Sequence, residues 1–384
     1  MDNAKHRHHF VPREYLRQWC VVKDGVLAVS IKGKCPFLTS VDTVGFENQF
    51  YAYEQLSLQD IKSILMFHPH VAPDSFMRAF FHHTIVLPIM FRLAMDPSNN
   101  ELLEIWRFLG ESNLLRGDEQ GKINSLYCEY NTDRTNFLIE KNRIEIEGFE
   151  NALARIEDSM WPILRRLLKG HCGFIKNEKL TYRFFLYIVM QRTRSPAFME
   201  IAESDNKILN MPEHMLKSAR YRRYIYPFDR AMQLARCRSS FAVRLLKNMS
   251  SLEYVTGDLP VVEVLWREKA ADYFFPISPR MALVFGFREG FENRFKWLDP
   301  SCREVVDRLN REICRQSVCQ IYATTPNVLA ENNYVAKGEL PKIDQQQLIR
   351  LKEESDNDKV TLNSRSVARD VGRRLGGHKD ERTK

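Results

Sequence analysis

The chain has 384 residues, of which 44% are apolar and 11% aromatic, and its formal net charge is +8. An apolar share of this size supports a packed core and excludes wholesale disorder. The longest apolar run, residues 84–95, is interrupted by Pro88 and Arg92 and is too short to span a bilayer, so we expect no membrane partner. The eight cysteines form no Cys-x-x-Cys pair and the first residues are polar. We therefore expect a cytoplasmic protein with reduced thiols, whose positive charge allows nucleic acid as a partner.

The N-terminal segment predicts one short helix and two extended pieces. Residues 10–20 favour a helix with Pro12 at its first position, because Tyr15, Leu16 and Trp19 fall on one face. Residues 26–31 lie between glycine-containing turns and are typical of a strand. A second extended piece is predicted at residues 49–53.

A helical pattern then covers residues 58–168, with breaks expected at Pro69, Pro73, Pro97 and Gly117. Between Phe149 and Leu167, apolar residues recur every three or four positions, which predicts one long amphipathic helix. Residues 180–193 are apolar on nearly every side, so this helix should be central.

The C-terminal half predicts short strands followed by one helix. After a polar stretch at residues 203–223, strands are expected at 252–256, 273–275 and 281–287, and a helix at about 302–321. Residues beyond 341 are mostly charged or polar and favour a flexible tail with at most a helix at 345–354. The predicted fold is α+β, predominantly α-helical, with a small antiparallel β portion. It forms one globular domain at residues 1–340, with a helical insertion at about 58–140 and a charged tail at 341–384.

Five stretches, in order, resemble the family known as "domain of unknown function 4238". They are His8-His9-Phe10-Val11-Pro12, Phe46-Glu47-Asn48-Gln49-Phe50-Tyr51, Gln191-Arg192-Thr193-Arg194-Ser195-Pro196, Tyr254-Val255-Thr256-Gly257-Asp258-Leu259-Pro260 and Phe275-Pro276-Ile277-Ser278-Pro279-Arg280. Residues 149–168 also look like the family's acidic helix, with Glu150 and Glu157 in place, and Asn310 resembles a family asparagine. The resemblance covers roughly residues 6–325 and implies a shared fold and a shared set of polar residues. It implies no agreed activity.

Two departures from the family pattern matter. The family usually has Ser-Asp-Asn-Pro where this chain has Gly257-Asp258-Leu259-Pro260, so two polar neighbours of the aspartate are missing. The stretch between Leu56 and Asn142 also looks longer than usual.

The adjacent histidines His8 and His9 are the first candidates for a site. The positive end of a helix beginning at Pro12 disfavours imidazolium, so a nearby histidine should stay neutral and accept a proton or bind a metal. Triosephosphate isomerase keeps a histidine neutral at a helix N-terminus in this way. Because side chains alternate along an extended segment, only one of the two should enter a site, and we expect His9. The alternative is that both histidines cap or pack at the N-terminus.

Asp258, Gln191, Arg192 and Arg194 complete the candidate set. Asp258 lies in a turn after a strand, where carboxylates often bind metals, but such an aspartate also commonly accepts hydrogen bonds from backbone N–H groups. Gln191, Arg192 and Arg194 end the apolar helix, where the arginines either bind a phosphate or carboxylate or complement the helix dipole. Arg280 is a second candidate anion contact, or a partner of Glu150 or Glu157.

Two hypotheses follow from these residues. The sequence contains no P-loop, GxGxxG, GxSxG or HExxH motif, which disfavours the corresponding enzymes. The first hypothesis is a metal-assisted nuclease or phosphodiesterase, with His9 and Asp258 binding Mg²⁺, Mn²⁺ or Zn²⁺ and arginines binding phosphate. The alternative is a non-catalytic binding or sensor module, associated with defence or mobile elements, in which the same residues form a structural network.

Overall fold

The structure, a computed structural model, describes residues 7–21, 25–48, 50–51, 54–66, 75–115, 117–171, 173–198, 213–237, 241–267, 270–287, 296–298 and 303–339. They all fall in the larger of two units of the chain, which comprises residues 1–203 and 212–340. Pro69, Pro73 and the predicted tail at 341–384, with its helix at 345–354, lie outside the described residues. The fold is α+β and predominantly α-helical, and its strands form small, mainly antiparallel sheets.

The N-terminal segment alternates short strands and short helical turns. They are β1 (Arg7–His9), α1 (Arg13–Leu16), η1 (Arg17–Trp19), β2 (Val26–Ile31), β3 (Phe37–Ser40), η2 (Val41–Thr43) and β4 (Phe46–Asn48). Strand β2 has the predicted bounds, and Gly25 turns the chain into it with a positive φ of 71°. The predicted helix is only four residues long before it tightens into η1, and Pro12 is its N-cap. Of the extended piece expected at 49–53, only residues 50 and 51 are described, and they form a turn; strand β4, just before them, pairs with β1.

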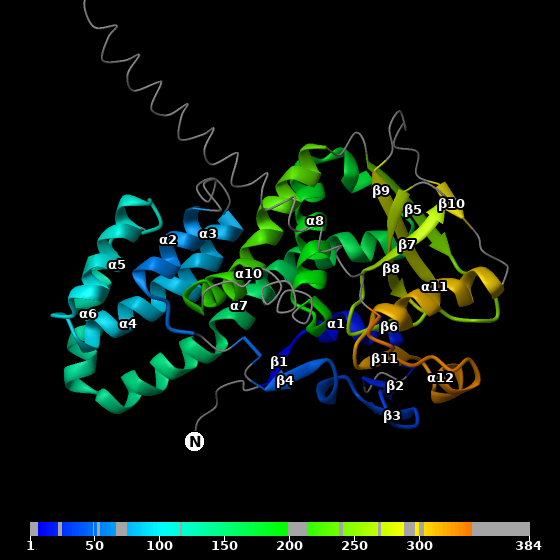
Figure 1. The fold of residues 1–384 in the computed structure, drawn as a ribbon, viewed down its shortest axis with the longest axis horizontal. Helices are drawn as coiled ribbons and strands as arrows, with labels where there is room; N and C mark the ends of the chain where they lie inside the picture. Colours follow the sequence, from blue (N-terminus) through cyan, green and yellow to red (C-terminus); the bar gives the residue numbers. More distant parts are fainter. Residues whose placement is uncertain are drawn as a thin grey trace, which may run out of the picture. The chain divides into compact units, whose positions relative to one another are not determined.

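The helices of the first half follow the predicted pattern closely. They are α2 (Leu58–Met66), α3 (Ser75–Phe81), the π-helical turn η3 (His82–Val86), α4 (Leu87–Met95), α5 (Asn100–Glu111), α6 (Glu119–Thr132) and α7 (Arg134–Leu168). Breaks occur at Pro97 and Gly117 as expected. The side chains of Asn99, Asp118 and Asp133 cap the N-termini of α5, α6 and α7 by accepting backbone N–H groups. Figure 1 shows α2 to α6 gathered around the first part of the long helix α7.

Helix α8 (Glu178–Thr193), which follows the turn η4 (Gly173–Lys176), is central as predicted. Phe184, Phe185, Leu186 and Tyr187 are all fully buried. It packs against α7 and along α10 (Glu213–Arg236). Residues 213–223, the second part of the stretch predicted to be polar, belong to α10, and residues 203–212 lie outside the described residues. That helix is held by a buried stripe of Tyr221, Tyr224, Ile225 and Phe228, which begins where the polar stretch was expected to end.

The remaining elements form two sheets and two helices. They are β5 (Phe241–Lys247), β6 (Thr256–Gly257), β7 (Val262–Arg267), β8 (Ala270–Ser278), β9 (Met281–Phe287), β10 (Lys296–Leu298), α11 (Arg303–Gln316), β11 (Gln320–Ala323) and α12 (Pro326–Glu331). One sheet has the order β10-β5-β9-β8-β7, with only the β10–β5 pair parallel, and the other has the order β3-β2-β11-β6. The second sheet therefore combines strands from the N-terminal and the C-terminal parts of the described chain.

Two predicted elements near the C-terminus have different bounds. The strand expected at 252–256 is reduced to β6. The backbone groups of the preceding residues bind the Asn310 side chain instead of another strand, because this side chain accepts from Val255 N–H and donates to the Glu253 carbonyl. The helix expected at 302–321 ends at Gln316, since residues 320–323 pair with β2 and β6 instead.

Candidate functional site

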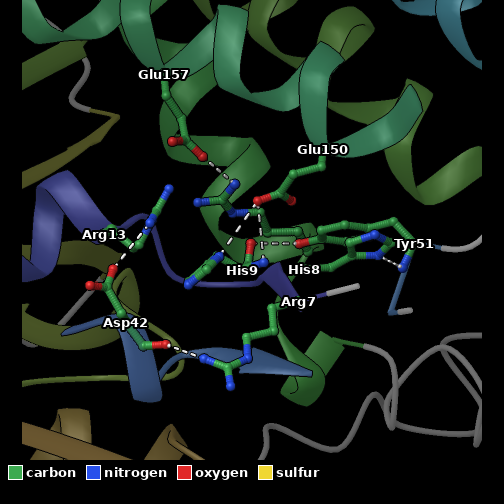
Figure 2. A network of polar contacts seen from close by, with 9 residues as sticks. Arg7, His8, His9, Arg13, Asp42, Tyr51, Glu150 and Glu157 are labelled. Atoms are coloured by element: carbon green, nitrogen blue, oxygen red, sulfur yellow. Dashed lines mark hydrogen bonds and ion pairs between the residues drawn. The ribbon is translucent and has the colours of Figure 1, made fainter. Parts of the chain in front are cut away.

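Strand β1 places the two adjacent histidines in different environments. His8 is fully buried, its Nδ1 accepts the backbone N–H of Tyr51 at 2.8 Å, and its ring stacks on the Tyr51 ring. Figure 2 shows His8 directed toward Tyr51, with His9 on the side of Glu150. His8 therefore fixes the segment after β4 to β1, while His9 is the histidine that reaches a cavity.

His9 is held beside Glu150 of α7 by contacts to one carboxylate oxygen. Its backbone N–H donates to Glu150 Oε1 at 3.4 Å, and its Nδ1 lies 3.7 Å from the same oxygen. The Tyr51 hydroxyl donates to the His9 carbonyl at 3.2 Å and fixes the strand from the other side. His9 Nε2 and Glu150 Oε2 make no hydrogen bond within the part of the chain that the structure describes. Both groups thus keep unused hydrogen-bonding capacity.

A second acidic residue lies on α7 two turns after Glu150. Seven residues separate Glu150 from Glu157, so both side chains lie on one face of the helix. Glu157 Oε1 accepts from Arg194 Nη1 at 2.6 Å, and Arg194 Nη2 donates to Gln191 Oε1 at 3.1 Å. Residues from two of the resembling stretches and from the acidic helix therefore meet here.

The ion pair between Glu157 and Arg194 is sheltered from water on the arginine side. Only 1% of the Arg194 side chain is exposed, against 21% for Glu157. Burial raises the pKa of the Glu157 carboxyl group, and Arg194 offsets part of that rise. Burial alone would lower the pKa of Arg194, but the facing carboxylate outweighs it and the pKa lies above its ordinary value. The arginine remains charged at any physiological pH.

A cavity of about 570 Å³ opens beside these residues. It is lined by residues from β1, α1, η1, η2 and α7, namely Arg7, His9, Pro12, Arg13, Glu14, Arg17, Asp42, Glu150, Asn151, Ala154 and Glu157. Figure 2 shows Arg7 and Arg13 around Asp42, on the side of His9 away from the α7 glutamates. Arg13 Nη1 donates to Asp42 Oδ1 at 3.0 Å, and Arg7 Nη1 donates to the Asp42 carbonyl at 3.3 Å.

The cavity is lined by charged side chains of both signs. Three arginines face four carboxylates, so the lining has a formal charge of −1 with His9 neutral. Arg13 and Asp42 are each about half exposed, at 48% and 57%. Such exposed pairs are worth only about 0–1 kcal/mol, so an anionic ligand can displace the carboxylate at little cost.

Asp258 belongs to a different polar network. Its two carboxylate oxygens accept three backbone N–H groups, from Val318 at 2.9 Å, Cys319 at 2.6 Å and Gln320 at 3.0 Å. The side chain is fully buried, and burial raises its pKa to about 6 against the lowering effect of these donors. Asp258 does not line the His9 cavity. Its contacts connect β6 to the turn between α11 and β11.

The two arginines at the end of α8, Arg192 and Arg194, also lie in different environments. Arg192 Nη2 donates to Glu263 Oε1 at 2.9 Å, and its guanidinium lies 5.1 Å from the centre of the Tyr273 ring. It lines a second cavity, whose lining shares no residue with the first. Arg280, predicted as an anion contact or a partner of the α7 glutamates, instead donates from Nη1 to the Ser250 carbonyl. Arg194 is the arginine that pairs with Glu157.

The residues predicted to share a metal ion do not fit that role together. His9 faces Glu150, whereas Asp258 uses both carboxylate oxygens on backbone donors. Across the described ranges, no group of three or more His, Cys, Asp or Glu side chains is arranged to hold a metal ion. The structure therefore places His9 beside Glu150 and Asp258 in a separate network, and does not bring His9 and Asp258 together.

The candidate site includes residues that were not selected from the sequence. Glu150 and Glu157 were noted in the acidic helix, and their seven-residue spacing beside an apolar stripe was the signal that they share a face. Arg13 and Arg17 are four residues apart, which also indicates a common side. Arg7 and Asp42 offered no comparable signal, because their proximity depends on how η2 and β1 pack.

The comparisons with known proteins identify the family. The structure defines the protein as an α+β fold in which one N-terminal histidine, His9, contacts the acidic helix α7. The sequence model of the family described as "Protein of unknown function (DUF4238)" matches residues 7–327, and the chain belongs to this family. No curated protein and no solved structure matches the chain. Among the described helices, none combines the length and apolar character needed to cross a membrane.

Proposed function

We propose that the protein hydrolyses phosphodiester bonds of nucleic acid in the cavity between β1, α1 and α7. The observation that carries this proposal is the His9–Glu150 pair, which lies in one cavity with three arginines. An imidazole oriented by a carboxylate is a common general base, and arginine is the preferred ligand of phosphate oxygens. The free cysteines of the described residues and the chain's positive charge agree with a cytoplasmic protein that acts on nucleic acid.

The proposed reaction assigns roles to three groups. Glu150 beside Nδ1 of His9 favours the tautomer with its proton on Nδ1, so that Nε2 accepts a proton from water. The oxygen of this water bonds to phosphorus, and the P–O bond to the leaving group breaks. The leaving oxygen takes up a proton from solvent water, and the protonated His9 releases its proton to solvent. Arg13 binds a non-bridging oxygen once phosphate displaces the Asp42 carboxylate, and Arg7, which donates from Nη1 to the Asp42 backbone carbonyl, binds phosphate with its remaining donors. The steps proposed here use only protein side chains and water.

The test is cleavage of labelled single-stranded DNA and RNA and of bis(p-nitrophenyl) phosphate by the full chain. Assays are run with a chelator and with added Mg²⁺, Mn²⁺ or Zn²⁺, which also tests the metal-assisted hypothesis. His9→Gln should lower kcat by about 100-fold or more, because general base catalysis contributes on the order of 10²–10⁴-fold. His171→Gln is the matched control, since His171 is exposed and does not line the cavity.

Two results would overturn the proposal. One is the absence of cleavage of all three substrates under every condition by protein that remains folded. The other is cleavage by His9→Gln at the rate of His171→Gln, with equal melting temperatures in both variants.

A second candidate function is a non-catalytic binding or sensor module, and the buried Arg194–Glu157 pair favours it. Such a pair, with Gln191 beside it, is typical of a network that fixes a fold. Under this proposal the protein binds nucleic acid without cleaving it, and its association with defence or mobile elements stays a prediction. Binding of an uncleaved oligonucleotide that is lost in Arg13→Gln, with Arg155→Gln as an exposed control on α7, would support it.

A further inference from the structure

A second cavity, of about 340 Å³, lies among α8, α10 and the five-stranded sheet. It contains Arg192, which the sequence grouped with the first site. Because the two cavities have no lining residue in common, a ligand here is independent of the proposed hydrolysis.

The walls of this second cavity are mainly aromatic. Phe185 meets Phe241 edge to face at 4.6 Å between ring centres, and Tyr273 stacks on Phe285 at 5.6 Å. All four rings line the cavity. Aromatic walls of this kind favour a flat apolar body, which packs against ring faces and edges.

Arg192 supplies this aromatic cavity with a guanidinium group that does not use all of its hydrogen-bond donors. Its Nη2 is bound by Glu263 at 2.9 Å and its guanidinium lies over the Tyr273 ring. Its Nη1 is buried and makes no hydrogen bond among the described residues. A buried donor without an acceptor is costly, and an anion bound at Nη1 would remove that cost.

The position of Glu263 is fixed from the other side of β7. Its backbone N–H donates to Gln316 Oε1 at 3.0 Å, and Gln316 Nε2 donates to its carbonyl at 2.7 Å. Glu263 therefore holds Arg192 with Nη2 occupied, which leaves Nη1 as the donor for a ligand.

Charge and size restrict the ligand. The lining carries two arginines, Arg192 and Arg230, and one carboxylate, Glu263, for a formal charge of +1. One negative charge on the ligand would balance it. A volume of about 340 Å³ is at the lower end for ligand sites, which fits one or two fused rings and is too small for a dinucleotide.

We propose that this cavity binds a small aromatic carboxylate, with its rings among Phe185, Phe241 and Phe285 and its carboxylate on Arg192 Nη1 and Arg230.

The test is titration of the full chain with 1-naphthoate by calorimetry, with 1-naphthalenemethanol as the uncharged analogue. Naphthoate should bind with a Kd below about 1 mM, and the alcohol at least about tenfold more weakly. Arg230→Gln should weaken naphthoate binding about two- to fivefold, because Arg230 is only partly buried. Glu263→Gln should strengthen it, because the change removes the carboxylate that competes for the Arg192 guanidinium.

The control variants separate this site from the first one. His9→Gln and His171→Gln should bind naphthoate as the unmodified chain does, whether or not the protein cleaves phosphodiesters. The double variant Arg192→Gln/Glu263→Gln leaves no carboxylate unpaired and should bind about tenfold more weakly or worse. The proposal is overturned if naphthoate does not bind below 1 mM, if the alcohol binds equally well, or if Arg230→Gln and the folded double variant both retain full affinity.

Discussion

Arg194 donates from Nη1 to Glu157 Oε1 at 2.6 Å, and only 1% of the Arg194 side chain is exposed. The pair joins the end of α8 to the face of α7 that also presents Glu150 to His9. A change at Arg194 should therefore affect both the stability of the fold and the geometry of the cavity.

Arg194→Met should lower the free energy of unfolding by about 3 kcal/mol or more, because it leaves the Glu157 carboxylate without its charged partner. The double variant Glu157→Gln/Arg194→Met should recover a substantial part of this loss. Urea unfolding of the two variants measures both values, with exposed Arg155→Met as the control. Equal losses in the single and the double variant would contradict the claim that the unpaired Glu157 carboxylate causes the loss.

Asp258→Asn should cost less stability at pH 7 than at pH 4. The folded-state pKa of Asp258 is raised to about 6 from an ordinary value of 3.8, so its contribution to stability is present below pH 4 and lost as pH rises through 6. A shift of about two pKa units corresponds to about 3 kcal/mol in the free energy of unfolding. The unmodified chain loses this amount as pH rises, and the asparagine variant does not. Unfolding is measured for both proteins from pH 4 to 7. The opposite trend would mean that the three backbone donors outweigh burial.

Asn310→Ala should lower the free energy of unfolding by about 1–3 kcal/mol. The change leaves the buried Val255 N–H without its acceptor and the Glu253 carbonyl without a donor. Asn131→Ala on the exposed surface of α6 provides the control, and thermal melting of both variants provides the measurement. Equal melting temperatures would exclude this role for Asn310.

Gly148→Ala should destabilise the protein, although alanine favours helices over glycine by about 1 kcal/mol. A Cβ atom at position 148 of α7 would lie 2.9 Å from the backbone oxygen of His83, which cannot move away as a flexible side chain would. Gly110→Ala in α5 is the matched control, because its Cβ would lie at an ordinary 3.6 Å from Leu115 Cδ1 and the helix should gain stability. Opposite signs are expected in chemical unfolding, and stabilisation by both changes would contradict the close contact.

Local sequence patterns predicted the elements whose residues carry their own periodicity. The bounds of β2 were correct because glycine-containing turns delimit it. The helix over Phe149 to Leu167 was correct because apolar residues recur at helical spacing, and α8 was correct because it is apolar on nearly every side. The extent of strand β6 was misjudged because a partner far along the chain decides it. Asn310, more than 50 residues away, replaces the strand pairing of Val255.

The candidate site was only partly predictable for the same reason. His9 and Glu150 are 141 residues apart, and no spacing rule connects a short strand to the middle of a 35-residue helix. Strand alternation distinguishes His9 from His8, but it does not name the group that each imidazole faces. Arg192 and Arg194 differ by two positions on one helix end, and their directions depend on α7 and β7, which pack on different sides.

The sheet β3-β2-β11-β6 has a consequence for synthesis of the protein. Strand β2 ends at residue 31, but its inner partner β11 begins at residue 320, and the Tyr15 hydroxyl contacts Thr256 and the Pro276 carbonyl. A ribosome adding roughly 5–20 residues per second needs about 15–60 s between making β2 and making β11. During that time the apolar N-terminal segment has been synthesised, but strand β11, which pairs with β2, has not. A nascent chain stopped before Tyr254 should therefore expose Tyr15 and Trp19, which contact Thr256, the Pro276 carbonyl and the Tyr254 carbonyl, and should depend on chaperones until these partners emerge.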